Sequence, residues 1–340
     1  MVYRRTVTRR LLSRARLWKG ILRVSLSSLT LRPYAGDADR DRTRDFLVAA
    51  TAASAPPYRY WHVGDLLWGM YQNTVFDPYA SIYLWEDAHG ELVAVVWSEE
   101  PGECEIQVAP ALSGGEVETS ILRWAEERAR TAGSPTLTAR GFADDAATVD
   151  LLTRHGFARD ERTPAALITK WGYPPDGYGY AHMARDLRQP IPEPDLPPGW
   201  TVRAVGGMDE WEARVNLHRD VWAPSRVTLD AYRRLRATPG YTPELDIVAI
   251  APDGTLASYC ICWLDSANAV GEFEPVGTRA AYRGQHVGRA VMLEGLRRLR
   301  DHGCATALVL TGTVNTPAVR LYESAGFQIF DVSHAYIRGL

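Results

Sequence analysis

The clearest chemical pattern in the sequence is a glycine-containing turn between a predicted strand and a long predicted helix. It reads Arg283-Gly284-Gln285-His286-Val287-Gly288-Arg289. Glycine allows the backbone to approach a ligand closely, and the unpaired N–H groups and positive dipole at the start of a helix suit a pyrophosphate. Such a turn is equally common as a purely structural feature, so its role depends on the residues that accompany it.

A second pattern follows after the next predicted strand. Asn315 is followed by Ala318, Tyr322 and Gly326-Phe327 at helical spacing. This is the distance expected for the second wall of one cofactor groove. The two patterns together therefore favour a cofactor site over a structural turn.

These patterns resemble the Gcn5-related N-acetyltransferase (GNAT) family, whose phosphate loop reads Arg/Gln-x-x-Gly-x-Gly/Ala and whose later segment ends in Asn…Tyr…Gly-Phe. The resemblance covers about residues 200–340. Arg283 and Gly288 occupy the outer loop positions, and His286 stands where the family usually has glycine. The resemblance implies acetyl-CoA as the acyl donor, no metal, and direct transfer of acetyl to a primary amine.

The resemblance also assigns roles on either side of the loop. The backbone of Val276, Gly277 and Thr278 would pair with the pantetheine amides, as a ligand adds a strand to a sheet. Asn315 would bind the amide end of the cofactor or hold the neighbouring strand in place. Tyr322 would donate a proton to the leaving thiolate, with core packing as the alternative.

Acetyl transfer to an amine also needs a proton acceptor, because an alkyl ammonium with a pKa near ~10.4 is almost fully protonated at neutral pH. Glu272 and Glu274 lie two residues apart on the predicted strand before the loop, so their side chains share one face. Glu272 precedes Arg283 by eleven residues, a spacing that resembles the catalytic glutamate of histone-acetylating relatives. We expect at least one of the two to relay the proton; the other binds substrate or solvent.

The elements that position these residues occur twice. Thr30-Leu31-Arg32-Pro33 is matched by Thr201-Val202-Arg203-Ala204 at an offset of 171, and Gly156-Phe157 by Gly326-Phe327 at an offset of 170. Between these anchors each half has the same order of predicted helices and strands. The sequence thus predicts an α/β protein of two tandem GNAT folds, each a mixed, mostly antiparallel sheet flanked by helices, similar to mycothiol synthase-like acetyltransferases of actinobacteria.

The predicted boundaries follow from composition. A basic extension at 1–30, with eight basic and no acidic side chains, precedes an N-terminal module at 31–188. A proline-rich linker at 189–199 favours extended geometry and leads into the catalytic module at 200–340. The extension is either an amphipathic helix or a disordered segment.

The predicted elements of the second half are a hairpin of 247–250 and 257–264, a strand at 269–278, and a helix at 287–300. A strand at 306–311, a helix at 316–325 and two closing strands at 327–332 and 334–338 complete it. The first-half counterparts are strands at 81–86, 92–98, 103–109 and 136–139 and a helix at 115–131.

The first half keeps this frame but loses the chemistry. Its loop, Ser113-Gly114-Gly115-Glu116, has no arginine, Asp145 stands at the Asn315 position, and Leu152 at the Tyr322 position. We predict a non-catalytic module that packs and encloses substrate, with residual cofactor binding left open. Nine aromatic residues could line a pocket between the modules or pack as core: Tyr58, Tyr60, Trp61, Trp68, Tyr71, Phe76, Tyr79, Tyr83 and Trp85.

Composition narrows the function classes. Residues 31–199 carry a net charge of −11 and residues 200–340 are neutral, so no folded segment is basic enough for nucleic acid. The sparse cysteines and the absence of a long apolar run predict a cytoplasmic protein that does not span a membrane. The acidity favours a cationic acceptor, such as an aminoglycoside or amino sugar. The competing class is a non-catalytic protein that binds or senses an acyl-CoA or an amine.

Overall fold

The computed structural model describes residues 26–54 and 58–340. Most of the predicted basic extension, residues 1–25, therefore lies outside the described residues. Tyr58 begins the stretch that connects two helices of the first half, and Leu340 ends the described chain. No helix in the described part of the chain is long and apolar enough to cross a membrane.

The strands and helices fall in the order that the two halves predict. The strands are β1 (Thr30–Pro33), β2 (Ile82–Glu86), β3 (Leu92–Trp97), β4 (Glu103–Val108), β5 (Thr136–Phe142), β6 (Ala158–Asp160), β7 (Tyr180–Asp186), β8 (Thr201–Ala204), β9 (Asp246–Ile250), β10 (Leu256–Asp265), β11 (Val270–Thr278), β12 (Thr306–Gly312) and β13 (Gln328–Gly339). The helices are α2 (Asp37–Ala53), α3 (Val63–Tyr71), α4 (Pro78–Ser81), α5 (Glu116–Thr131), α6 (Ala146–Arg154), α7 (Ala165–Trp171), α8 (Trp211–Val221), α9 (Leu229–Ala237), α10 (Val287–Asp301) and α11 (Thr316–Ser324), with short 3-10 turns η1 (Leu26–Ser28), η2 (Pro110–Leu112), η3 (Pro243–Leu245) and η4 (Ala280–Tyr282).

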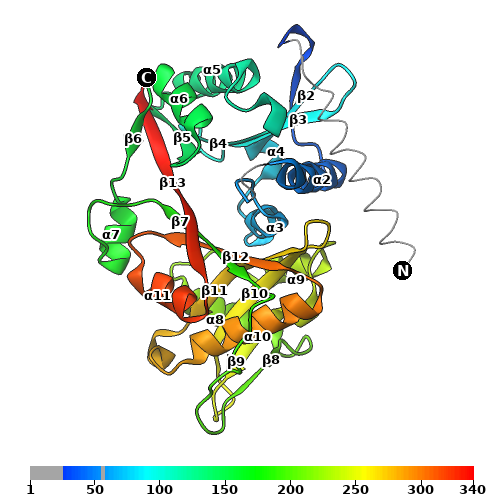
Figure 1. Cartoon of the computed structure of the whole chain (residues 1–340), viewed down its shortest axis with the longest axis vertical. Coiled ribbons are helices and arrows are strands. Elements are labelled where there is room, and N and C mark those ends of the chain that lie inside the picture. Colours follow the sequence, from blue (N-terminus) through cyan, green and yellow to red (C-terminus); the bar gives the residue numbers. More distant parts are fainter. Residues whose placement is uncertain (1–25, 55–57) are drawn as a thin grey trace.

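The strands form one continuous path that runs through both modules (Figure 1). Its order is β1-β2-β3-β4-β5-β13-β7-β12-β11-β10-β9-β8, with β6 beside β13. Among the described strand pairs, β4 with β5 and β11 with β12 are parallel and the others antiparallel. The fold class is therefore confirmed: each half is a mixed, mostly antiparallel sheet flanked by helices.

The two halves exchange their last strands. Strand β7 of the first half pairs with β12, whereas the end of β13 pairs with β5 of the first half. Ser333 is the crossing point, because it lies opposite Tyr180 on one side and Phe142 on the other. The proposed division at 189–199 thus separates two sequence halves whose sheets share strands.

This exchange corrects one sequence-based expectation. The predicted closing strands at 327–332 and 334–338 form the single long strand β13, with a register shift between Ile329 and Asp331. Ser333, the residue between the two predicted strands, is where β13 passes from one sheet to the other. Such long-range pairing has no local sequence signal.

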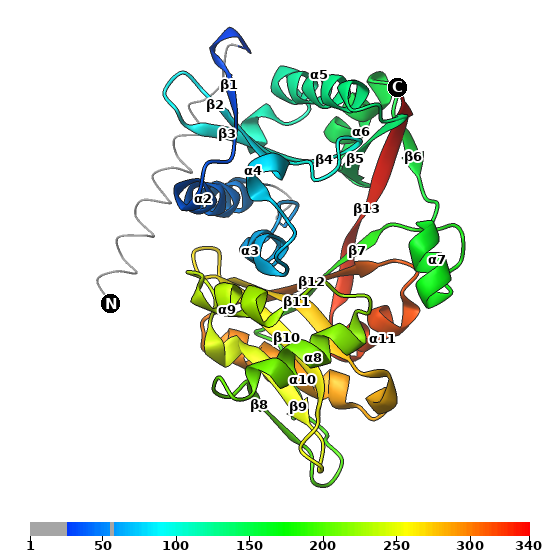
Figure 2. The ribbon, with the colours of Figure 1, turned by 180° about the vertical axis from the view of Figure 1, so that it is seen from behind.

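Helix α3 joins the two modules. Leu66 and Met70 pack in a core cluster of the first half, whereas Leu67 and Trp68 pack with Trp263 and side chains of α8 and α9. A helix of this length that is apolar on opposite faces must be covered on both sides. Figure 2 shows α3 between the upper sheet and the lower module, on the side where α8 and α9 lie.

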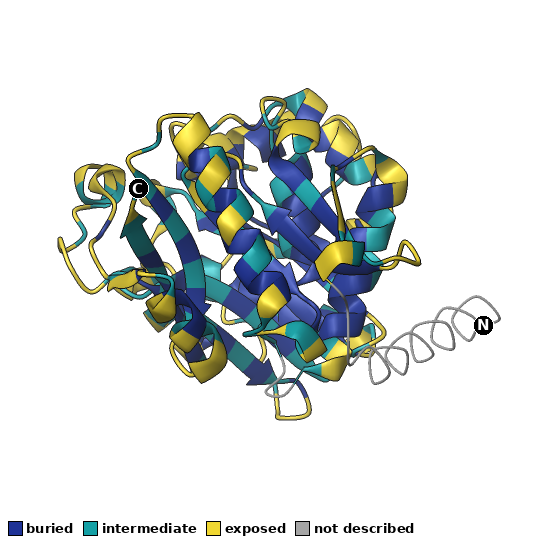
Figure 3. Ribbon diagram, turned by 90° about the horizontal axis from the view of Figure 1, so that it is seen from above, coloured by how far each residue is buried: buried dark blue, intermediate teal, exposed yellow. Residues whose placement is uncertain are grey.

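The remaining core lies between the sheets and their covering helices. In the second half, α10 buries Val287, Val291 and Leu296 against β9, β10 and β11, and in the first half α5 buries Ile121 and Ala125 in the same way. Figure 3 shows the pattern: buried strands run through the interior and the helices alternate buried with exposed residues. The linker is also held, because Arg297 donates to the carbonyl of Pro192 at 3.0 Å.

Candidate functional site

The predicted phosphate loop turns sharply before α10. Gly284 has φ of 75° and His286, the N-cap of α10, has φ of 61°. A positive φ at a non-glycine residue is uncommon, and it explains why glycine is usual where His286 stands. His286 forms no side-chain cap. The N–H groups of the first turn of a helix have no acceptor within the helix, so this turn can receive an anion.

The loop is packed closely against the end of β11. A Cβ atom on Gly288 would lie 3.0 Å from Thr278 Oγ1, and Arg283 Nε donates to the carbonyl of Thr278 at 3.3 Å. Arg289 instead donates to the carbonyl of Ser324 at 3.0 Å, so it ties α10 to the end of α11. Gln285 is exposed and donates to the carbonyl of Ala281 at 3.3 Å.

Strands β11 and β12 part in front of this loop. Their pairing covers Val270–Phe273 on β11. Beyond it, Val276, Gly277 and Thr278 stay paired with β10 but have no described strand on the β12 side. A sheet edge of this kind offers main-chain donors and acceptors to an extended ligand. The gap and the loop together fit a pantetheine arm that ends in a pyrophosphate.

The two candidate carboxylates lie deep beside helix α3. Glu272 is 5% exposed, and its Oε2 lies 3.1 Å from Nδ1 of His62, the N-cap of α3. The Cβ of an alanine at Gly64 would lie 2.5 Å from the same oxygen, so the start of α3 is pressed directly onto Glu272. The backbone of Glu274 is fixed by Trp263, whose Nε1 donates to its carbonyl at 2.6 Å.

Burial raises the proton affinity of two carboxyl groups here, those of Glu274 and Asp65. Burial and the charge of Glu272 raise the pKa of Glu274 to about 8. Burial and the charges of Glu272 and Glu274 also raise the pKa of Asp65 well above its ordinary value. A carboxyl that titrates near the operating pH is suited to general-base catalysis, and Glu274 meets this condition.

On the second wall of the groove, Tyr322 is a buried side chain, whereas Asn315 caps a helix. Tyr322 is buried against Phe327, and burial together with the charge of Glu274 raises its pKa above the ordinary value. Its hydroxyl therefore stays protonated near neutral pH. Asn315 caps α11 by accepting from the amide of Ala318 at 3.4 Å, and donates to Thr311 Oγ1 at 3.3 Å. These contacts favour the structural role for Asn315.

The corresponding cleft of the first half is closed by its own side chains. Glu118, at an offset of 170 from Gly288, accepts from the amide of Gly114 at 2.7 Å. Tyr60 donates to the carbonyl of Val108 at 2.7 Å, on the strand that corresponds to β11. The carboxylate of Glu118 and the hydroxyl of Tyr60 thus bond to the backbone groups that a cofactor phosphate and amide would use. This supports a non-catalytic first half.

A cavity of about 930 Å³ extends between the modules, from this closed cleft to the two glutamates of β11. Its acidic lining residues are Asp65, Glu99, Glu103, Glu105, Glu118, Asp145, Glu272 and Glu274, and its guanidinium groups are Arg59 and Arg140. Arg140 bonds to Glu105 at 2.9 Å and Arg59 to Asp331 at 3.2 Å. Burial and Arg140 lower the pKa of His182 to about 3, so its ring is neutral. The lining therefore holds many more carboxyl groups than cationic groups.

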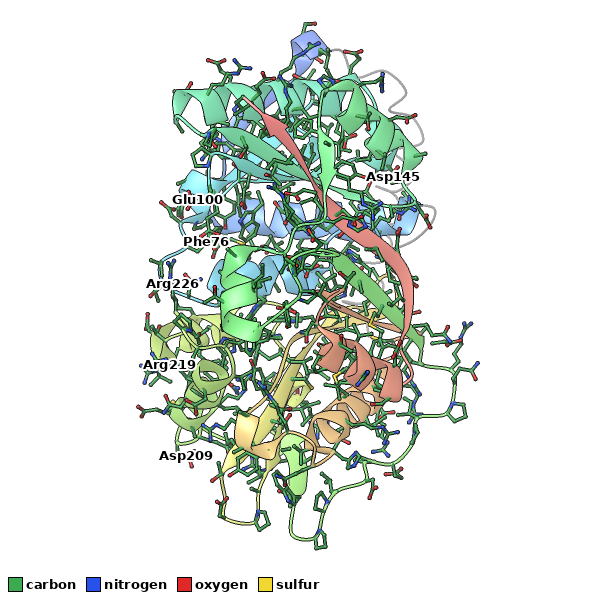
Figure 4. The ribbon with its side chains drawn as sticks, turned by 90° about the vertical axis from the view of Figure 1, so that its left-hand side faces the viewer. Phe76, Glu100, Asp145, Asp209, Arg219 and Arg226 are labelled. Atoms are coloured by element: carbon green, nitrogen blue, oxygen red, sulfur yellow. The ribbon has the colours of Figure 1, made fainter. Side chains whose placement is uncertain are left out.

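The cavity does not reach the phosphate loop, since none of 283–289 lines it among the described residues. It does reach Glu272 and Glu274 of β11. Figure 4 labels Asp145 in the upper module and shows β7 and β13 running between the upper and lower modules. An acceptor in the cavity and a donor in the groove would meet near Glu274.

Sequence reasoning missed His62 and Asp65. Both belong to a capping box at the start of α3, in which His62 accepts from Gly64 and the amide of His62 donates to Asp65. The aromatic set divides: Tyr58, Tyr60, Trp61 and Trp68 line the cavity, whereas Tyr83 and Trp85 pack around Trp124. No group of three or more His, Cys, Asp or Glu in residues 26–54 and 58–340 is placed to hold a metal.

Comparisons with known proteins agree with this geometry. Residues 211–327 match the family described as Acetyltransferase (GNAT) family. A mycothiol acetyltransferase of Thermobispora bispora is 34% identical over 166 residues, which cover 46% of this chain and 56% of that protein. One of Paenarthrobacter aurescens is 25% identical and covers 74% of each. The chain spans about half the length of the first of these curated relatives.

Solved structures match over nearly the whole chain. A tandem GNAT protein from the clavulanic acid biosynthesis pathway has a TM-score of 0.61 at 18% identity and covers 92% of this chain and 98% of that one. A GCN5-related N-acetyltransferase from Sphaerobacter thermophilus has a TM-score of 0.60 at 18% identity and covers 92% and 96%. At this identity the likeness shows the fold. Residues 211–327 are thus similar to the GNAT acetyltransferase family, and the chain as a whole has the fold of tandem GNAT proteins.

Proposed function

We propose that this protein transfers an acetyl group from acetyl-CoA to a primary amine of a small cationic molecule, and that the C-terminal half carries the reaction. The observation that carries the proposal is the position of Glu274. It lies where β11 and β12 part, beside Tyr322 and on the lining of the acidic cavity. A candidate base (Glu274), a candidate acid (Tyr322), the donor groove and the cavity thus meet near Glu274.

The donor side is supported by the fit of the groove. The free edge of Val276–Thr278 suits an amide-bearing arm, and the first turn of α10 suits its pyrophosphate. Gly288 keeps the turn close to Thr278. When bound, acetyl-CoA supplies the acetyl group and leaves as the free thiol.

The protein's own groups supply the proton transfers. Glu274, as a carboxylate, would take the proton of the incoming ammonium, directly or through water. The hydroxyl of Tyr322 would hold a proton for the departing sulfur. Glu272 lies against His62 at 3.1 Å rather than free in the groove. We therefore assign the relay to Glu274.

The acceptor side is supported by charge. Eight carboxyl groups and two guanidinium groups line the cavity, and each guanidinium has a carboxylate partner. An amine with further cationic or polar groups suits this lining better than a hydrophobic or anionic one. An aminoglycoside or amino sugar is of this class, and the acceptor of mycothiol acetyltransferases belongs in the same panel.

The test is a panel of amines matched in size and differing in charge, with products identified by mass spectrometry. We expect acetylated product from the cationic members, with kcat/KM falling as the Debye length shortens from about 30 to 8 Å. Equal use of neutral and anionic amines, or no effect of salt, would contradict the acidic-cavity argument. Binding of acetyl-CoA without any product would favour the sensing alternative.

A further inference from the structure

His62 connects the first half of the chain to Glu272, the neighbour of the candidate base in the second half. It is the N-cap of α3 and is 7% exposed, and its Nδ1 lies 3.1 Å from Glu272 Oε2. The same Nδ1 lies 3.1 Å from the amide nitrogen of Gly64. One ring nitrogen cannot serve both contacts at once. With Nδ1 unprotonated the ring accepts from Gly64, whereas with Nδ1 protonated, as in an imidazolium, it presents an N–H group to Glu272.

The surroundings of His62 favour the imidazolium. Burial alone would lower the pKa of His62, but the negative charges of Glu272 and Asp265 outweigh this and raise it. The groups that interact electrostatically with His62, Asp65 or the two glutamates are almost all acidic or neutral. They are Asp65 on α3, Asp265 and Tyr259 on β10, Glu105 on β4 with its partner Arg140 on β5, and Tyr322 on α11.

We propose that His62 is a positioning residue for the proton relay: as an imidazolium contributed by the first half, it holds the side chain of Glu272 in place and offsets negative charge next to Glu274. This inference rests on the proposed acetyl transfer. It gives the otherwise non-catalytic half a part in the reaction, because α3 is fixed in both core clusters and carries His62 to the site.

The physical reason is the number of carboxyl groups that share the site. Without the imidazolium, Glu272, Glu274 and Asp65 would lie together with no cation of their own, since Arg140 is bonded to Glu105. Like charges in a poorly solvated site disfavour the ionised forms. Glu274 would then hold its proton to higher pH and would be a base over a narrower range.

The test uses His62→Asn, because asparagine also caps helices well and the start of α3 is kept. We expect the acidic limb of the pH profile of kcat/KM to move upward by about 1 pH unit. The double variant His62→Asn/Glu272→Gln should move the limb back to or below its wild-type position, because the charge that His62 offsets is then gone. Thr228→Asn, which keeps the cap of α9 and changes no charge, is the matched control and should leave the limb in place.

A second readout needs no turnover. In protein labelled with ¹³C at the glutamate carboxyl carbons, the Glu274 signal is identified by its loss in Glu274→Gln. Its titration midpoint should rise in His62→Asn and return in the double variant. An unchanged midpoint in a folded His62→Asn protein would overturn the inference, even if amines are acetylated. A shifted midpoint with no acetylation of any amine would support the pairing and leave the proposed function contradicted.

Discussion

Replacing Gly288 with glutamate should abolish acetyl-CoA binding, because the first half already carries this change. Glu118 stands at the equivalent position, and its carboxylate accepts from the amide of Gly114 at 2.7 Å. Gly114 and Gly284 both have positive φ, 70° and 75°, so the two loops turn alike. A glutamate at 288 should therefore bond to the amide of Gly284 and block the first turn of α10.

The magnitude follows from charge. Two negative charges about 4 to 5 Å apart repel by about 3 to 4 kcal/mol at an effective dielectric constant of ~20. A loss of about 3 kcal/mol weakens binding by more than about 100-fold. Burial raises the pKa of Glu118 to about 7, so an equivalent glutamate would be ionised above that pH. The loss should therefore be larger at pH 8 than at pH 6.

Titration calorimetry at both pH values measures this directly. Wild-type protein should bind one acetyl-CoA per chain, and Gly288→Ala is the steric control. Its added Cβ meets the hydroxyl of Thr278 at 3.0 Å, and we expect less than about 10-fold weakening. Glu118→Gly should create no second site, since Tyr60 still bonds to Val108. Two sites in the wild type, or unchanged binding by Gly288→Glu, would refute the reasoning.

Three further variants test the site and the fold. Tyr322→Phe should lower kcat by roughly 10- to 10⁴-fold with little change in cofactor affinity, the range for loss of a general acid; wild-type rates across pH would assign the acid elsewhere. Because Glu274 acts as a carboxylate and its pKa is raised to about 8, kcat/KM should fall as the pH drops below about 8. Glu274→Gln should lose this limb, and its survival would move the relay to another group. Gly326→Ala should lower the unfolding free energy by at least about 2 kcal/mol, because φ is 89° and the Arg185 guanidinium fills the space a Cβ needs; an unchanged denaturation midpoint would contradict this.

Much of the fold could be predicted because local pattern and repetition agree. The Pro252-Asp253-Gly254 turn produces the β9–β10 hairpin, and the apolar spacing from Val287 onward produces α10. The matched anchors place η2 and η4 at the same point of each half. The exchange of β7 and β13 could not be predicted, because the residues of a strand do not indicate which of two sheets it joins.

The candidate site could be predicted only in part. The phosphate loop and the Tyr322 segment match motifs, and Glu272 and Glu274 can be found by their spacing from each other and from Arg283. His62 and Asp65 carry neither signal. Their residue types at the start of a helix indicate a capping box, and only the packing of α3 between both modules brings them to Glu272. A contact made across two halves of a chain has no counterpart in sequence spacing.

The central claim is that Glu274 and Tyr322 serve one acetyl transfer, from a donor in the groove to an amine in the acidic cavity. The most direct measurement mixes enzyme, acetyl-CoA and a cationic amine in a single turnover and counts free thiol and acetylated amine together. The account predicts equal amounts of both in wild-type protein, with the rate reduced in Glu274→Gln and in Tyr322→Phe. Thiol release without acetylated amine, or equal rates in all three proteins, would contradict it.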